Sequence, residues 1–186
     1  MVSFVQMLIP IVAAAVAVFV ASSLIHMVIK WHQPEYRKLP NEDDVRNAVR
    51  AGGAGPGQYI IPYCSDPKEF QSDAMKQKLT EGPVGVMTLR APCVPSMGPM
   101  LGSWFALNLV VAGVAGYLAC STLTTAASFL AVCRLVGGVT FLAYGTGSIA
   151  NAIWWGKPGS ATIKEVLDAF IYGLVSALAF AWLWPR

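Results

Sequence analysis

Four polar residues stand inside long apolar stretches of this sequence and are its first candidates for chemistry: Asn108, Asn151, Asp168 and Tyr172. Polar side chains are costly in hydrocarbon, and in membrane helices they usually face other helices or a water-filled cavity. One interpretation is therefore a polar pocket or a small ion path near one membrane surface. The other is that these side chains hydrogen-bond neighbouring helices and fix their packing, and we favour this second interpretation for the set.

Arg134 is the only charged residue between Ala91 and Trp155. It stands about one helical turn inside the end of an apolar stretch, so its long side chain can extend to the lipid headgroups. No acidic residue lies on the same side of the apolar stretches to pair with it. A lipid phosphate or the water interface is therefore the expected partner, and an inward-facing cation that binds an anionic lipid or a protein is the alternative.

Small residues recur at helical spacing along one face of two apolar stretches, 100–123 and 129–155. Such residues let helix backbones approach closely in a membrane. Within one chain the two faces can pack against each other, and self-association through them is an additional possibility. The expected helix-packing positions are Gly113, Gly116, Gly138, Gly145 and Ser148.

The histidines and cysteines form no recognised motif. His26 and His32 are the only histidines, and no His-Glu-x-x-His, Cys-x-x-Cys, Gly-x-Ser-x-Gly or phosphate-binding loop is present. A haem would need two facing imidazoles, which one chain does not offer at suitable depth. The sequence therefore predicts no catalytic residue, no cofactor and no metal site. Cys120 and Cys133 flank a short connection, where free thiols and a disulfide are both open.

The elements that must position these residues are long and apolar. Of the 186 residues 55% are hydrophobic and 12% are charged, whereas an average soluble domain is about 25% charged. A helix that crosses a bilayer core needs ~20 mostly apolar residues, and within lipid all backbone groups must be satisfied inside the span. The sequence predicts four such helices, at about 4–29, 100–123, 129–155 and 166–184.

The charged residues are concentrated in a polar insert. Between Lys30 and Arg90 lie 9 of the 13 Lys/Arg and 8 of the 10 Asp/Glu. A segment this small buries too little to be stable alone, so we expect it to rest on a membrane surface or on a partner. Its nearly balanced charge argues against nucleic acid. Capping and turn residues predict a helix, a strand, a helix and a strand at 41–52, 59–61, 66–80 and 84–89.

Together these patterns predict an all-α membrane protein: a four-transmembrane-helix bundle with a small α+β cytosolic insert between helices 1 and 2. The predicted domains are helix 1 at 1–29, the insert at 30–99, and helices 2–4 at 100–186. The side with the insert carries 11 of the 13 Lys/Arg, and the other side carries only Arg186. The positive-inside rule then places the insert in the cytosol and both termini outside, in a bacterial inner membrane.

For function, the absence of catalytic motifs favours a non-enzymatic assembly or accessory subunit that self-associates or joins a larger membrane complex. The expected partners are the lipid bilayer, a second copy of the chain or other membrane subunits, and not nucleic acid. A small oligomeric transporter or channel with a polar pocket near the cytosolic side is the first alternative. A membrane enzyme acting on lipid, using His32, Asp66 and Glu69 near the interface, is the second.

Overall fold

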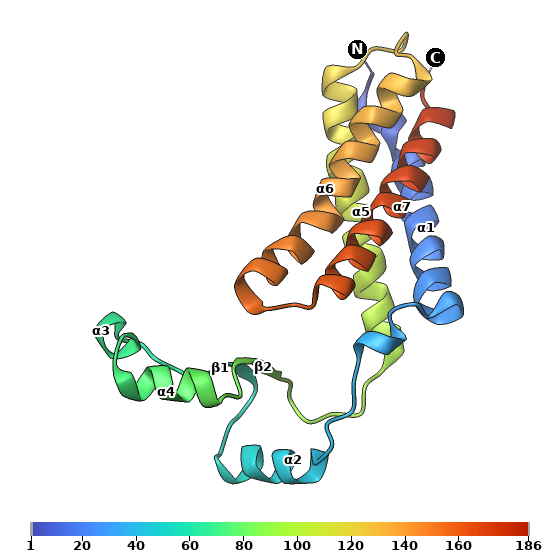
Figure 1. Cartoon of the computed structure of the whole chain (residues 1–186). Helices are drawn as coiled ribbons and strands as arrows, with labels where there is room; N and C mark the ends of the chain where they lie inside the picture. Colours follow the sequence, from blue (N-terminus) through green and yellow to red (C-terminus); the bar gives the residue numbers. More distant parts are fainter. Residues whose placement is uncertain (1, 186) are drawn as a thin grey trace. The chain divides into compact units, whose positions relative to one another are not determined.

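The computed structural model describes residues 2–185, so Arg186, which the orientation argument used, lies outside the described residues. The chain divides into two compact units (Figure 1). The first, here called the helical unit, comprises Met1–Tyr36 and Ser96–Arg186, and the second, the insert unit, comprises Arg37–Pro95. Residues 30–36 thus belong with the helical unit, because they pack on its helices rather than on the insert.

The chain is mostly helical, and four of its helices are long and apolar enough to cross a membrane, as the sequence predicts. The first, Phe4–Ile29, is continuous through η1 (Phe4–Met7), α1 (Leu8–Ser23) and η2 (Leu24–Ile29). The other three are α5 (Met97–Thr122), α6 (Phe129–Trp155) and α7 (Gly159–Trp182). The helix α7 begins earlier than the predicted 166, and this adds Lys164 and Glu165 to its first turns.

The four long helices pack around a shared apolar core. Met7, Ala115, Val136 and Phe180 come from four different elements and are all fully buried in it. The helices α6 and α7 approach most closely at Gly137 and Gly173, where a Cβ added to Gly173 would lie 2.9 Å from the Gly137 carbonyl oxygen. The start of η1 and the end of α7 lie at the same end of these helices (Figure 1).

The insert unit contains α2 (Glu42–Ala51), β1 (Gly57–Ile61), α3 (Pro67–Phe70), α4 (Asp73–Glu81) and β2 (Gly85–Leu89). The strands pair antiparallel, with Tyr59 opposite Met87. The helix predicted at 66–80 is divided in two, because the Ser72 hydroxyl accepts a hydrogen bond from the Met75 backbone N–H and starts α4 as a new helix. Asp66 caps α3, where its side chain accepts from the Lys68 backbone N–H.

Candidate functional site

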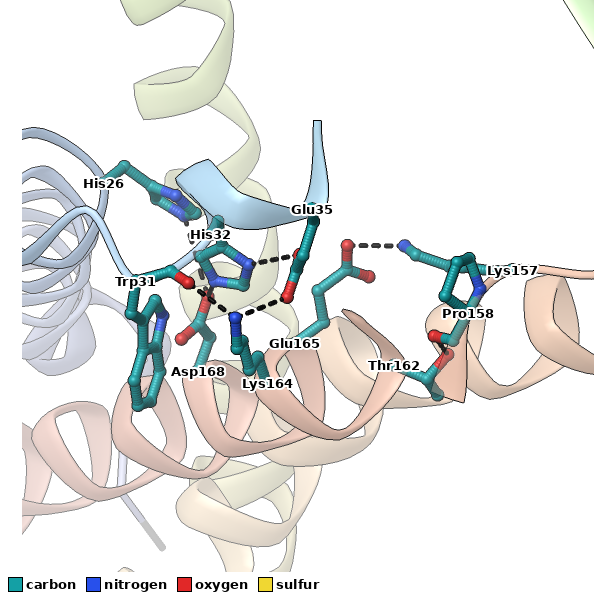
Figure 2. Close-up of polar contacts among 10 residues, drawn as sticks. All are labelled: His26, Trp31, His32, Glu35, Lys157, Pro158, Thr162, Lys164, Glu165 and Asp168. Carbon is teal, nitrogen blue, oxygen red and sulfur yellow. Dashed lines mark hydrogen bonds and ion pairs between the residues drawn. The ribbon is translucent and has the colours of Figure 1, made fainter. Parts of the chain in front are cut away.

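A change of helix geometry at the end of the first span prepares the candidate site. The last turn, η2, is a π-helix, and the Lys30 backbone N–H donates to the Ile25 carbonyl oxygen at 2.9 Å. Lys30 then adopts the left-handed conformation, with φ of 56°. Because few non-glycine residues adopt this conformation, it marks a sharp and specific reversal. The chain folds back after it, and the segment Trp31–Glu35 lies against the first turns of α7 (Figure 2).

His32 lies between two carboxylates. Its Nδ1 is 3.0 Å from Glu35 Oε2, and its Nε2 is 2.8 Å from Asp168 Oδ2 on α7 (Figure 2). All three side chains are largely withdrawn from the surface: 10% of the His32 side chain is exposed, 12% of Glu35 and 5% of Asp168. Buried polar groups are usually hydrogen-bonded, and here His32 pairs with one oxygen of each carboxylate.

Lys164 fixes the returning segment to α7. Its Nζ donates to the Trp31 carbonyl oxygen at 2.6 Å and lies 2.9 Å from Glu35 Oε1. Burial raises the pKa of the Glu35 carboxyl, but hydrogen bonds from Lys164 and His32 outweigh burial, so this pKa lies below its ordinary value. Glu35 is therefore ionised near neutral pH and accepts the His32 Nδ1–H. A second pair, Lys157 with Glu165, lies beside this network (Figure 2).

His26 completes the cluster from η2. Its ring stacks on that of His32, with centroids 4.9 Å apart and an interplanar angle of 27°. Its Nε2 is 3.7 Å from Asp168 Oδ2, and half of its side chain is exposed. Both histidines of the chain thus approach one carboxylate oxygen. The other oxygen, Asp168 Oδ1, is buried without a hydrogen-bond partner among residues 2–185, and so is Trp31 Nε1.

The arrangement limits the chemistry of the site. Both ring nitrogens of His32 face carboxylates, so neither is free to activate a serine, threonine or cysteine nucleophile. Two carboxylates placed around two imidazoles are suited to bind a proton or a cation instead. His26, His32 and Asp168 each offer one ligand atom, and these atoms lie within 4.8 Å of one another.

The polar residues singled out by sequence fall into different surroundings. Asn108 is buried, and its Oδ1 accepts a hydrogen bond from the Tyr144 hydroxyl at 2.8 Å. Tyr144 makes an edge-to-face contact with Tyr172 at a centroid distance of 5.3 Å. Asp168, one turn before Tyr172 on α7, is held by His32. Asn151 is exposed on α6, and no hydrogen bond recorded among residues 2–185 joins its side chain to the other three.

The small residues expected at helix contacts fall into two groups, those that contact a neighbouring helix and those that do not. Gly116 and Gly145 lie in close contacts, because an added Cβ would meet Ile11 at 3.0 Å and Ala169 at 3.2 Å respectively, and Ser148 is buried. Gly113 and Gly138 face open space, with no atom within 4 Å of an added Cβ.

Arg134 is exposed on α6, beside a groove of about 440 Å³ between α6 and α7. The apolar lining of this groove includes Phe141 and Leu174. Cys120 and Cys133 are free thiols and form no disulfide with each other.

The sequence predicts no link between the histidines and Asp168, and it predicts no role in a site for Glu35 or Lys164. The available signal was the composition around the end of the first span, where both histidines of the chain, a tryptophan and a glutamate fall within ten residues of one another. No motif spacing links them to α7, because His32 and Asp168 are separated by 136 positions.

The four long apolar helices indicate a multi-pass membrane protein. No protein family, curated protein or solved structure matches the chain. Function is therefore argued from the geometry of this chain alone.

Proposed function

We propose that this chain is a non-enzymatic membrane protein that acts as an assembly or accessory subunit and uses its insert unit to dock a partner. The observation that carries this proposal is burial. Within residues 37–95, all of which the structure describes, Met75 is the only buried residue. A unit that buries so little apolar surface does not offset the entropy of ordering its chain, so a further surface must cover it.

An apolar cleft on the insert unit is the surface that favours a partner. It has a volume of about 390 Å³ and lies between α2 and the sheet. Val45 and Val49, one turn apart on α2, form one wall, and Met87 and Leu89 of β2 form the other. The charged residues that line it are mostly cations, namely Arg46, Arg50 and Arg90, with Glu42.

The chemistry of this cleft selects its occupant. An apolar cleft lined in part by arginines is complementary to an apolar segment of a partner protein that carries acidic residues. The bilayer is the weaker candidate, because residues 37–95 carry 8 Lys/Arg and 7 Asp/Glu. Membrane recruitment by charge requires a clear excess of cations on one surface.

The test is site-specific photocrosslinking in the full-length chain, with the photoreactive residue at position 49. We expect one discrete adduct with a protein other than this chain. The double variant Arg46→Glu/Arg50→Glu should reduce the adduct at least tenfold, whereas the matched variant Lys68→Glu/Lys78→Glu, on exposed positions of α3 and α4, should not. Adducts with lipid alone, adducts at twice the mass of the chain, or adducts insensitive to the arginine changes would each contradict the proposal.

Ion passage is the second candidate function, and one feature favours it. Asn108 Nδ2 and Thr140 Oγ1 are buried between the long helices without a partner among residues 2–185. Orphaned polar atoms in an apolar core are positions where water is stabilised. Flux through the reconstituted protein that disappears in Asn108→Leu would support this candidate, and the absence of flux in the wild type would remove it.

The proposed setting is a bacterial inner membrane, with the insert unit in the cytosol and Arg134 at a lipid phosphate near the outer surface. The distribution of Lys/Arg supports this orientation. Cys93 is exposed on the insert unit and reports the orientation directly. A membrane-impermeant thiol reagent should leave Cys93 unlabelled in intact cells and label it in inverted vesicles, and the reverse pattern would overturn the orientation.

A further inference from the structure

We propose that His26, His32 and Asp168 bind a divalent transition-metal ion, with Zn²⁺ as the reference probe. This inference does not depend on the docking function, because the three residues belong to the helical unit and the docking cleft belongs to the insert unit.

The first argument is the convergence of ligand atoms. The Nε2 atoms of both histidines approach Asp168 Oδ2, at 2.8 Å for His32 and 3.7 Å for His26. In a tetrahedral zinc site with bonds of 2.0–2.2 Å, neighbouring ligand atoms lie about 3.3 Å apart. The two observed separations fall on either side of this value. All three ligand atoms lie within 4.8 Å of one another, so rotation of the histidine side chains is what would bring them around one ion.

The second argument is the support of His32 from behind. A histidine that binds a metal through one ring nitrogen almost always donates the other N–H to a carboxylate or a carbonyl group. His32 Nδ1 lies 3.0 Å from Glu35 Oε2, and Glu35 is itself held by Lys164. This arrangement fixes the ring and directs Nε2 toward Asp168.

The third argument is the state of Asp168. Its side chain is 5% exposed, and Oδ1 makes no hydrogen bond of normal geometry among the described residues, although the similarly unpaired Trp31 indole N–H is a neighbouring donor. Leaving a buried carboxylate oxygen without a partner is costly, and a cation on Asp168 would lower this cost directly. The ion would also replace the proton that lies between His32 Nε2 and Asp168 Oδ2, since neither atom can bond the other without one.

The ligand set defines the class of ion. Two imidazole nitrogens and one carboxylate oxygen suit Zn²⁺ and related first-row divalent ions, whereas Mg²⁺ and Ca²⁺ prefer sites made of oxygen alone. Three protein ligands leave a fourth position for water, and the half-exposed His26 shows that protein does not enclose the cluster on one side. The site is thus the open type rather than the closed, four-ligand structural type.

The experiment uses the full-length protein, purified in mild detergent with an affinity tag that contains no histidine and stripped with a chelator. Zinc binding is followed by calorimetry and by metal analysis after gel filtration, with Mg²⁺ as the comparison ion. We expect one Zn²⁺ per chain and no saturable binding of Mg²⁺. A zinc content well below one per chain at saturation would overturn the proposal.

His26→Ala is the decisive variant. Half of the His26 side chain is exposed, so this change should leave the fold intact while removing one ligand, and we expect Zn²⁺ affinity to fall at least tenfold. Met27→Ala, on the same helical turn and exposed, is the matched control and should bind as the wild type does. Unchanged affinity in His26→Ala would overturn the proposal even if variants of Asp168 did not fold.

Two further variants test the support of His32 by Glu35 and the alternative that cysteine thiols bind the zinc. Glu35→Gln should weaken binding about 10- to 100-fold through loss of the support behind His32. Cys64→Ser/Cys93→Ser should have no effect, because neither thiol belongs to the cluster. Zinc binding that disappeared in the cysteine variant would assign the metal to the thiols and refute the proposed site.

Discussion

The two units of the chain are held together by contacts of different range. In the helical unit, side-chain hydrogen bonds join segments far apart in sequence, and His32 with Asp168 and Trp31 with Lys164 are separated by 136 and 133 positions. In the insert unit, the recorded side-chain bonds join residues no more than four positions apart, as in Arg46 with Asp43 and Tyr59 with Gly55. There the pairing of β1 with β2 is the main longer-range contact.

The range of the contacts determines how much of each unit is buried. Local contacts shape short helices and turns but bury little, so the insert unit retains exposed apolar side chains such as Val45, Tyr63 and Phe70. Long-range contacts in the helical unit bury both apolar and charged groups, and each such contact depends on the correct position of two helices. The helical unit therefore holds a cluster of defined geometry, whereas the insert unit leaves apolar side chains exposed.

The largest expected effect comes from removing one member of the buried pair. In metal-free protein, Asp168→Ala should lower the free energy of unfolding by about 3–5 kcal/mol, because it leaves His32 buried with an unpaired nitrogen. Asp43→Ala, which breaks the exposed pair with Arg46, should cost less than about 1 kcal/mol. Denaturation in detergent measures both changes. Equal losses in the two variants would contradict the contrast between the units.

A methyl group at the closest helix contact should have the next largest effect. Gly173→Ala places a Cβ 2.9 Å from the Gly137 carbonyl oxygen, so α6 and α7 must separate at a cost of about 1–3 kcal/mol. Gly138→Ala, one position from Gly137 but facing open space, should instead gain up to about 1 kcal/mol from helix propensity. Opposite shifts in the denaturation midpoint are expected, and a shift of the same sign would refute this packing.

Trp104→Phe removes a hydrogen bond between two long helices, since Trp104 Nε1 donates to Ser22 Oγ at 2.9 Å. We expect a loss of about 1 kcal/mol, because the oxygen of the buried Ser22 loses its donor, although its hydroxyl still donates to the Phe19 carbonyl oxygen. Tyr59→Phe in the insert unit also removes one hydrogen bond, to the exposed Gly55 carbonyl. Its effect should be smaller, because water replaces the lost donor. The same denaturation experiment compares them, and a larger loss for Tyr59→Phe would reverse the comparison.

Removal of most of the insert unit should have the smallest effect on the stability of the helical unit. Replacement of residues 41–91 by a Gly/Ser linker of equal length should change the unfolding free energy of the helical unit by no more than about 1 kcal/mol, since an equally long loop has a similar closure entropy. Zinc binding should persist, while the crosslink through the docking cleft is lost. Unfolding of the helical unit in this variant would show that the two units are not independent.

Much of the local structure follows from the sequence. The four long helices were predicted because each needs only a run of apolar residues, which is a property of contiguous sequence. The elements of the insert were located from caps, and Asp66 does cap α3. The break before α4 was missed, because Ser72 competes as a second cap within one predicted helix. Asn41 precedes α2 as predicted but makes no side-chain capping bond.

Composition along the chain is enough to predict four helices able to span a membrane and a polar insert, because the preference of a segment for water or hydrocarbon depends on its own residues. The meeting of His26 and His32 with Asp168 is a property of the folded chain alone. That meeting depends on the π-helical end of the first span, on the left-handed conformation of Lys30 and on the rotation of α7. Lys30 is neither glycine nor asparagine, so the residue type does not predict the left-handed conformation that reverses the chain. A contact between residues 136 positions apart produces no periodic pattern in the sequence, so it cannot be predicted from residue spacing.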